Sequence, residues 1–234
     1  MIRNLWACLM VVFALCAVGA QIDRSVRRQP FLAPLVPPPF RSFAQWQITV
    51  TSVRSAPPPA ALAEARRLVE RSPVPSESFT FLAVALERNG DRKGSGLAIQ
   101  RAALRGWRDP IAQRAMYDIA LTAGDHTEAA RRLAALYGLQ DDQTPLKGMT
   151  DNLVSTQAGR QAMADSLVTG GYWTKAFMRA AVSGFSPNMA TTVNAGFRRG
   201  AVIDCQTATV LKRLYLEKGF AGDAPLLDKC RRKD

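Results

Sequence analysis

Two Gly-Asp pairs punctuate the middle of the chain, Gly90-Asp91 and Gly124-Asp125. Each pair ends a stretch whose apolar residues recur every three or four positions, which is the period of an α-helix packed on one side. A glycine followed by a short polar residue is typical of a helix end and a tight turn. The second glycine lies 34 residues after the first. The sequence therefore predicts a repeated unit of two helices and two turns.

Apolar stripes with the helical period continue from Ala60 almost to the C-terminus and predict an all-α fold. The predicted helices run from Ala60 to just before Pro73, through 79–86, 95–105, from Pro110 to 122, 129–137, 151–169 and 174–183, then through a hairpin after Pro187, a stripe at 210–215 and a last short helix with Leu226, Leu227 and Cys230. We expect 140–150 to be a loop because it contains Pro145 and Gly148.

A spacing of 34 residues is the tetratricopeptide period. Small residues, Ser95 and Ala129, stand five positions after each glycine, and in the same register Ala61 and Pro73 take the small-residue and closing-proline positions. Residues 60–138 thus resemble a tetratricopeptide-repeat protein. The resemblance implies antiparallel helical hairpins stacked as a short α-solenoid that holds a partner. The sequence departs from the family at the aromatic positions of the first helix, which are filled by Leu82, Leu86 and Ala120.

The repeat becomes irregular after Gly138. The segment 98–107 is similar to 176–185, and both carry the pattern Arg-Ala-Ala-x-x-Gly-aromatic. The offset between them does not match the 34-residue period. We therefore expect residues 139–234 to form less regular helical hairpins and a C-terminal cap.

Residues 1–20 have the plan of a secretory signal peptide. Arg3 precedes an uncharged apolar stretch, 5–20, which ends in the small residues Val18-Gly19-Ala20. We expect cleavage after Ala20 and a periplasmic or secreted body. The alternative is an uncleaved inner-membrane anchor formed by residues 5–20, in which case the three arginines within 24–28 would favour a cytoplasmic body.

Residues 21–59 are rich in proline and predict a linker. Within this segment Trp46, Ile48 and Val50 alternate with polar residues, which is typical of a short extended strand.

The formal net charge of +12 indicates an acidic partner. A protein or peptide fits this charge, and so does an anionic membrane or wall surface. Nucleic acid is disfavoured because the arginine pairs are dispersed and no aromatic stacking platform accompanies them. Arginine used only as a solvated surface residue explains the charge equally well.

The cysteines predict a disulfide if the chain is exported. Cleavage after Ala20 would remove Cys8 and Cys16 and leave Cys205 and Cys230, an even count that favours one bond in an oxidising compartment. Two buried free thiols would suit a cytoplasmic body instead.

Residue types that carry catalysis are scarce, and we predict that the protein is not an enzyme. His126 is the only histidine, and one histidine cannot supply both a base and a multi-histidine metal site. The sequence contains no glycine-rich phosphate loop and no zinc or nucleophile motif, so we expect no cofactor and no metal. Most glutamates lie beside arginines as salt-bridge partners would. A wall-glycan hydrolase with one buried glutamate is the third hypothesis.

The predicted function is a non-enzymatic scaffold or adaptor of tetratricopeptide type in the bacterial cell envelope. Residues on the first helices that face away from the stacking core would line a partner groove, and these are Thr80, Arg88, Arg114 and Asp118. Plain solvated surface is the alternative role for each of them. The alternative function is an envelope accessory protein that contacts anionic lipid or polysaccharide through its arginines.

Overall fold

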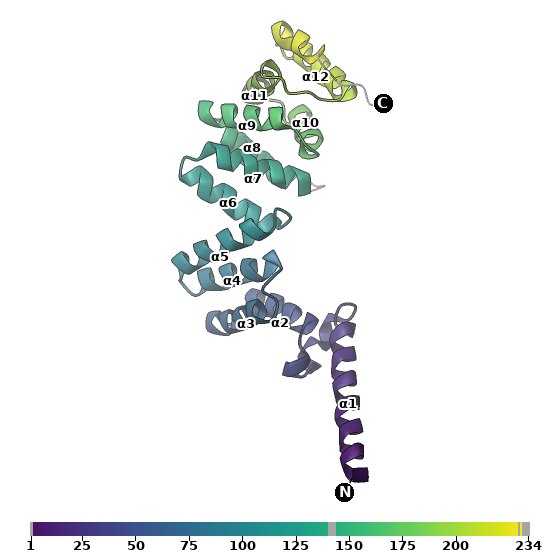
Figure 1. Cartoon of the computed structure of the whole chain (residues 1–234). Coiled ribbons are helices and arrows are strands. Elements are labelled where there is room, and N and C mark those ends of the chain that lie inside the picture. Colours follow the sequence, from purple (N-terminus) through teal and green to yellow (C-terminus); the bar gives the residue numbers. More distant parts are fainter. Residues whose placement is uncertain (1, 140–143, 229, 231–234) are drawn as a thin grey trace. The chain divides into compact units, whose positions relative to one another are not determined.

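A computed structural model of the chain describes residues 2–139, 144–228 and 230. Each regular element in this described part is an α-helix or a 3-10 helix, and within each unit the helices pack against neighbouring helices (Figure 1). The all-α, helical-repeat-like fold predicted from the sequence is confirmed. The chain divides into two compact units, unit 1 (residues 1–106) and unit 2 (residues 107–234).

Unit 1 consists of a long N-terminal helix followed by two short 3-10 helices and four packed helices. The elements are α1 (Ile2–Ser25), η1 (Pro30–Leu35), η2 (Pro38–Phe40), α2 (Phe43–Ser55), α3 (Pro58–Arg71), α4 (Ser76–Arg88) and α5 (Arg92–Arg105). Helix α2 packs on α3, α3 on α4, and α4 on α5, so each helix buries its apolar stripe against the next. The stripe predicted from Ala60 is that of α3, where Ala61, Leu62, Ala65 and Leu68 are buried.

The two Gly-Asp pairs form equivalent turns, one in each unit. Gly90 and Gly124 have φ of 84° and 75°, a left-handed conformation that glycine adopts without a steric penalty. The aspartate after each glycine then caps the next helix. The carboxylate of Asp91 accepts a hydrogen bond from the Gly94 N–H at 2.8 Å, and that of Asp125 accepts one from the Glu128 N–H at 2.9 Å. In each pair, the glycine therefore ends one helix and the aspartate begins the next.

The predicted strand around Trp46 is wrong, because residues 43–55 form helix α2. The buried residues of α2 recur with the helical period, at Ala44, Gln45, Thr49, Val50 and Val53. The alternation at 46–50 spans too few residues to outweigh this longer pattern.

The prediction that residues 21–59 form an irregular linker is also wrong. Four of its residues form a small core between α1, η1 and α2, and these are Val26, Ala33, Val36 and Ala44. The prolines do prevent a long α-helix across 30–39, but the chain there folds into two 3-10 helices that pack on the rest of unit 1.

Unit 2 holds the larger core. Its elements are α6 (Pro110–Thr122), α7 (His126–Leu139), α8 (Thr144–Val154), α9 (Gln157–Thr169), α10 (Trp173–Ser183), α11 (Pro187–Arg198), α12 (Cys205–Glu217) and η3 (Ala221–Asp228). Helix α7 packs on α6, α8, α9 and α10, and α9 also packs on α11 (Figure 1). Fully buried side chains of this core include Leu133 and Leu136 on α7, Leu146 and Leu153 on α8, and Phe177 on α10.

The loop predicted at 140–150 and the long helix predicted at 151–169 are wrong for the described residues. Residues 144–154 form α8 and residues 157–169 form α9; residues 140–143 lie outside the described part. Pro145 stands in the first turn of α8, where a missing N–H costs little. The last short helix is the 3-10 helix η3, and Cys230 follows it.

A sharp turn separates α8 from α9. Thr156 caps α9 by accepting a hydrogen bond from the Gly159 N–H at 3.0 Å. A Cβ atom at Gly159 would lie 1.8 Å from the carbonyl oxygen of Leu153, so the chain can reverse this tightly only with glycine at that position.

Candidate partner-binding site

Thr80, the first residue of the predicted groove, is wrong as a partner contact because it is buried. Only 1% of the residue is exposed, and it lies in unit 1 on helix α4. Helix α4 is contacted by α2, α3 and α5, so its packed face is broader than one apolar stripe. A threonine at the edge of the stripe is enclosed by these neighbours.

Arg88 is engaged in holding unit 1 together. Its guanidinium donates hydrogen bonds to the carbonyl oxygens of Ser52 (3.3 Å), Val53 and Ala56 (2.8 Å). These carbonyls lie at the end of α2, where the last turn of a helix has acceptors without intrahelical donors. A cation there also complements the negative end of the helix dipole. Arg88 therefore caps α2, and this role was not predicted.

Arg114 and Asp118 are exposed on helix α6, one turn apart. They remain accessible to a partner as predicted, but they belong to unit 2, whereas Thr80 and Arg88 belong to unit 1. Of the four predicted residues, only Arg114 and Asp118 are exposed neighbours on one helix.

A cleft in unit 2 is a better candidate for binding than the predicted residues. It has a volume of about 460 Å³ and is lined by α7, α8, α10 and α11 through Tyr137, Thr144, Lys147, Thr150, Asp151, Arg179, Ala180, Ser183, Gly184 and Met189. A second hollow of about 450 Å³ shares Lys147, Asp151, Ser183 and Gly184 with it and continues along Val154, Phe185, Ser186 and Asn188. We call the two together the α8–α10 cleft. Its size lies within the usual range of binding pockets.

Hydroxyl groups and cations dominate the polar lining of the α8–α10 cleft. The hydroxyls of Tyr137 and Thr150 are 2.7 Å apart at its buried side, and Thr150 also donates to the carbonyl of Leu146 at 2.8 Å. Burial raises the pKa of Tyr137, so its hydroxyl keeps its proton near neutral pH. At the exposed side Lys147 pairs with Asp151 at 2.8 Å, and Arg179 projects from α10. The three charged groups leave the cleft with one net positive charge.

The acidic residues of the described chain lie mostly in ion pairs and helix caps. Glu64 pairs with Arg67, Glu87 with Arg92, and Glu128 with both Arg131 and Arg132. These are the roles expected of glutamates on solvated helix faces. Across the described ranges, no three His, Cys, Asp or Glu side chains lie together as the ligands of a metal ion would.

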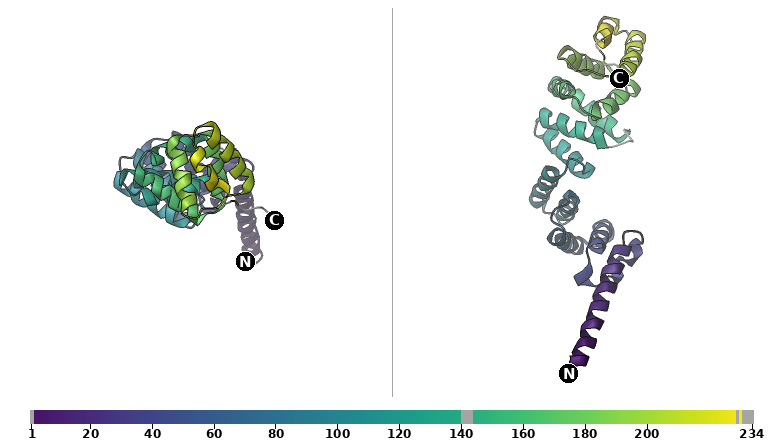
Figure 2. Two further views of the ribbon diagram at one scale, coloured as in Figure 1. Left: turned by 90° about the horizontal axis from the view of Figure 1, so that it is seen from above. Right: turned by 45° about the vertical axis from the view of Figure 1, so that its right-hand side comes forward.

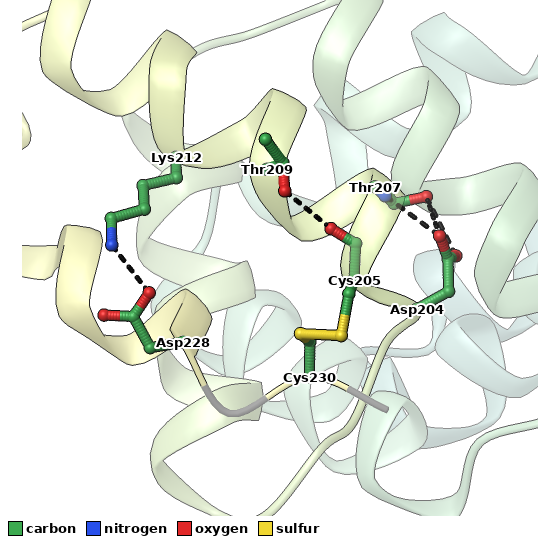
Figure 3. Close-up of a disulfide and its surroundings, with 7 residues drawn as sticks. All are labelled: Asp204, Cys205, Thr207, Thr209, Lys212, Asp228 and Cys230. Atoms are coloured by element: carbon green, nitrogen blue, oxygen red, sulfur yellow. Dashed lines mark hydrogen bonds and ion pairs between the residues drawn. A yellow bond between two sulfur atoms is a disulfide. The ribbon is translucent and has the colours of Figure 1, made fainter. Parts of the chain in front are cut away.

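The disulfide predicted on the condition of export is present between Cys205 and Cys230, whose Cα atoms are 4.9 Å apart (Figure 3). It joins the first residue of α12 to the segment after η3. Burial opposes ionisation of Asp204, but hydrogen bonds from Thr207 outweigh it and lower the pKa of this carboxyl. Asp204 therefore caps α12 as a carboxylate beside the disulfide.

Comparison of the chain with protein-family models, curated proteins and solved structures found no match. A function must therefore be inferred from the chain's own geometry. The α8–α10 cleft was missed in the sequence because its charged residues come from two helices that are distant along the chain. The segment 176–185 did mark the end of α10, where Gly184 and Phe185 line the cleft.

Proposed function

We propose that the chain is a non-enzymatic scaffold of the bacterial cell envelope, of tetratricopeptide type, that binds a protein partner. The observation that supports this most is the α8–α10 cleft: an open, elongated hollow between packed helices, lined by hydroxyl and cationic groups. Helical-repeat proteins commonly bind extended segments in hollows between their helices.

The partner's chemistry follows from the lining. Lys147 and Arg179 favour carboxylates, while the hydroxyl groups favour amide groups. A short acidic peptide segment combines both features. The formal net charge of +12 would also speed its encounter with the protein.

An envelope location is supported by two features. The chain has an apolar N-terminal helix with the length and composition of a signal sequence or a membrane anchor. The Cys205–Cys230 disulfide persists in oxidising compartments. The arginines at 24–28 instead favour a cytoplasmic location for the body, because basic residues beside a membrane span prefer the cytoplasmic side. Protease added to spheroplasts should digest unit 2; protection of unit 2 would place the body in the cytoplasm and contradict this location.

Peptide binding by matched variants tests the cleft. The probes are fluorescent Asp- and Glu-rich peptides with scrambled and Lys-rich counterparts, and the measurement is fluorescence anisotropy with the full chain in detergent. Lys147→Ala/Arg179→Ala should weaken binding of the acidic probe by about 10- to 100-fold, because two charge-assisted hydrogen bonds are lost.

Arg101→Ala/Arg213→Ala is the control, because it removes the same charge from exposed positions outside the cleft. Unchanged binding by the control, together with a loss in the cleft variant, supports the proposal. An equal loss in both variants would show diffuse electrostatic attraction and would reject the cleft as the site.

An envelope accessory protein that contacts anionic lipid or polysaccharide is the second candidate. The observation in its favour is that the exposed residues Arg24 and Arg28, at the end of the apolar helix α1, are followed in the chain by exposed Phe31 and Leu35 of η1. Cations next to apolar groups suit the headgroup layer of a membrane. Weaker binding of Arg24→Ala/Arg28→Ala than of the unmodified full chain to phosphatidylglycerol vesicles, with the difference abolished by salt, would favour this function over peptide capture.

A further inference from the structure

Helix α1 exposes an apolar surface along most of its length. Nine large apolar side chains between Leu5 and Val18 are each 54% to 71% exposed. Only 6% of the most apolar window in Asn4–Ser25 is buried, so α1 is not a core helix. The first 17 residues of α1, Ile2–Val18, rise about 26 Å, which is at the short end of the lengths that span a hydrocarbon core of about 30 Å. Length and composition alone fit both a cleaved signal and a retained anchor.

The C-terminal end of α1 is part of the folded body of unit 1. Asp23 is only 4% exposed, although it is a charged residue on this helix. Its Oδ1 accepts hydrogen bonds from the N–H groups of Ser42 (3.0 Å) and Ala44 (2.9 Å), and its Oδ2 accepts one from Phe43 (3.1 Å). These are donors at the start of α2, so the cap of α2 is supplied by α1.

A close apolar contact lies one turn before Asp23. Gly19 is buried against the ring of Phe40, and a Cβ atom at this position would lie 2.6 Å from the ring. Ile22, and Val26 immediately after the helix, contribute to the small core formed with η1 and α2. The contact of α1 with the body therefore extends over its last two turns, from Gly19 to Ser25.

Cleavage after Ala20 would cut α1 between Gly19 and Asp23. The remaining part of α1, Gln21–Ser25, would be five residues long and would lose the carbonyl acceptors of the preceding turn. A helix this short does not persist in water. Asp23 would then stand on a frayed chain end, and three N–H groups of α2 would lose a fixed acceptor.

We propose that α1 is retained as a bilayer-spanning anchor whose last two turns, Gly19–Ser25, are built into unit 1. The partner of its exposed apolar surface is the lipid bilayer. Within unit 1, the first part of α1 extends away from α2–α5 (Figure 1 and the right-hand view of Figure 2). The site after Ala20 has small residues suitable for cleavage, but it lies within a continuous helix that carries the cap of α2.

Intact mass of the membrane-bound protein tests the proposal. The full chain with a C-terminal tag is produced in a bacterium, and its membranes are washed with alkaline carbonate and extracted with detergent. We expect the tagged chain in the washed membranes with a mass that includes residues 2–20. A chain that begins at Gln21, or recovery in the carbonate wash, would overturn the proposal.

Two variants make this result decisive. Leu15→Pro/Val18→Ala breaks the helix and places Ala-Gly-Ala before Gln21, so it should be processed and shows that the host peptidase reaches the segment. Leu9→Arg/Val12→Arg places two charges at the centre of the span and should release the chain from carbonate-washed membranes. Membrane retention of this second variant would mean that α1 does not cross the bilayer. Peptide capture by unit 2 is measured separately, so either proposal can fail without the other.

Discussion

Removing the Cys205–Cys230 disulfide should destabilise unit 2 by an amount set mainly by the loop that the bond closes. The cysteines are 25 positions apart, so the closed loop holds about 26 residues. In the chain-entropy model, the disulfide lowers the conformational entropy of the unfolded state. Its removal therefore lowers the free energy of unfolding by about 3.5 kcal/mol. Unit 2 spans residues 107–234, and at about 3–6 °C per kcal/mol for a unit of this size its melting temperature should fall by roughly 10–20 °C.

Without the disulfide, unfolding of unit 2 should begin at its C-terminal end. Without the disulfide, η3 is still held by the buried Leu227, by the ion pair of Asp223 with Arg198 at 2.8 Å, and by that of Asp228 with Lys212 at 2.6 Å. Ion pairs this exposed contribute little. Amide hydrogen exchange should therefore rise first in η3 and the start of α12, and later in the core around α7.

Thermal melts of Cys205→Ser/Cys230→Ser, followed by circular dichroism, measure this effect. Cys8→Ser/Cys16→Ser is the matched control, because both cysteines are free and exposed on α1, and its melt should coincide with that of the unmodified chain. A reductant should shift the unmodified chain and the control to the melting temperature of Cys205→Ser/Cys230→Ser. Coincident melts of all three proteins without reductant would refute the reasoning from loop closure.

Three further changes test contacts on which the fold depends. Asp23→Ala should lower the free energy of unfolding of unit 1 by about 2–4 kcal/mol in denaturant titrations, because three N–H groups lose a carboxylate acceptor. Gly159→Ala should cost unit 2 about 3 kcal/mol, because the new Cβ would overlap the Leu153 carbonyl; an unchanged melting temperature would mean that this turn relaxes. Burial, with a smaller contribution from Asp118, raises the pKa of Tyr117 from 10.0 to about 12. The stability from its neutral hydroxyl is fully present below pH 10 and is lost as the pH rises to about 12, by up to about 3 kcal/mol. Tyr117→Phe should flatten this part of the stability profile.

The helices were predictable where the signal is local. Gly90-Asp91 and Gly124-Asp125 act through their own backbone conformation and their own side chains. The residues that determine each turn therefore lie within about five positions of one another in the sequence. The same holds for α10, where the predicted range 174–183 differs by one residue from the observed start at Trp173. Local chemistry of this kind needs no knowledge of what packs nearby.

The predictions failed where one residue type or pattern is compatible with two different local structures. Proline breaks the interior of a helix but is tolerated in its first turn, and Pro145 is in the first turn of α8. The alternation at Trp46, Ile48 and Val50 fits a strand, although the wider set of buried positions in α2 fits only a helix. The choice depends on burial, and burial is decided by neighbours that a local pattern does not contain.

Site residues are harder to predict because their partners lie about one helical hairpin away in the sequence. Arg88 at the end of α4 has the same local pattern whether it reaches solvent or the carbonyls of Ser52 and Ala56, which precede it by more than thirty residues. Lys147 and Arg179, the cations of the α8–α10 cleft, are separated by a similar distance in the chain. In a fold built from stacked helices, each hairpin contributes half of every cleft. The sequence of one hairpin therefore predicts the helices that border a cleft, while the charges that face each other across it depend on how the next hairpin packs.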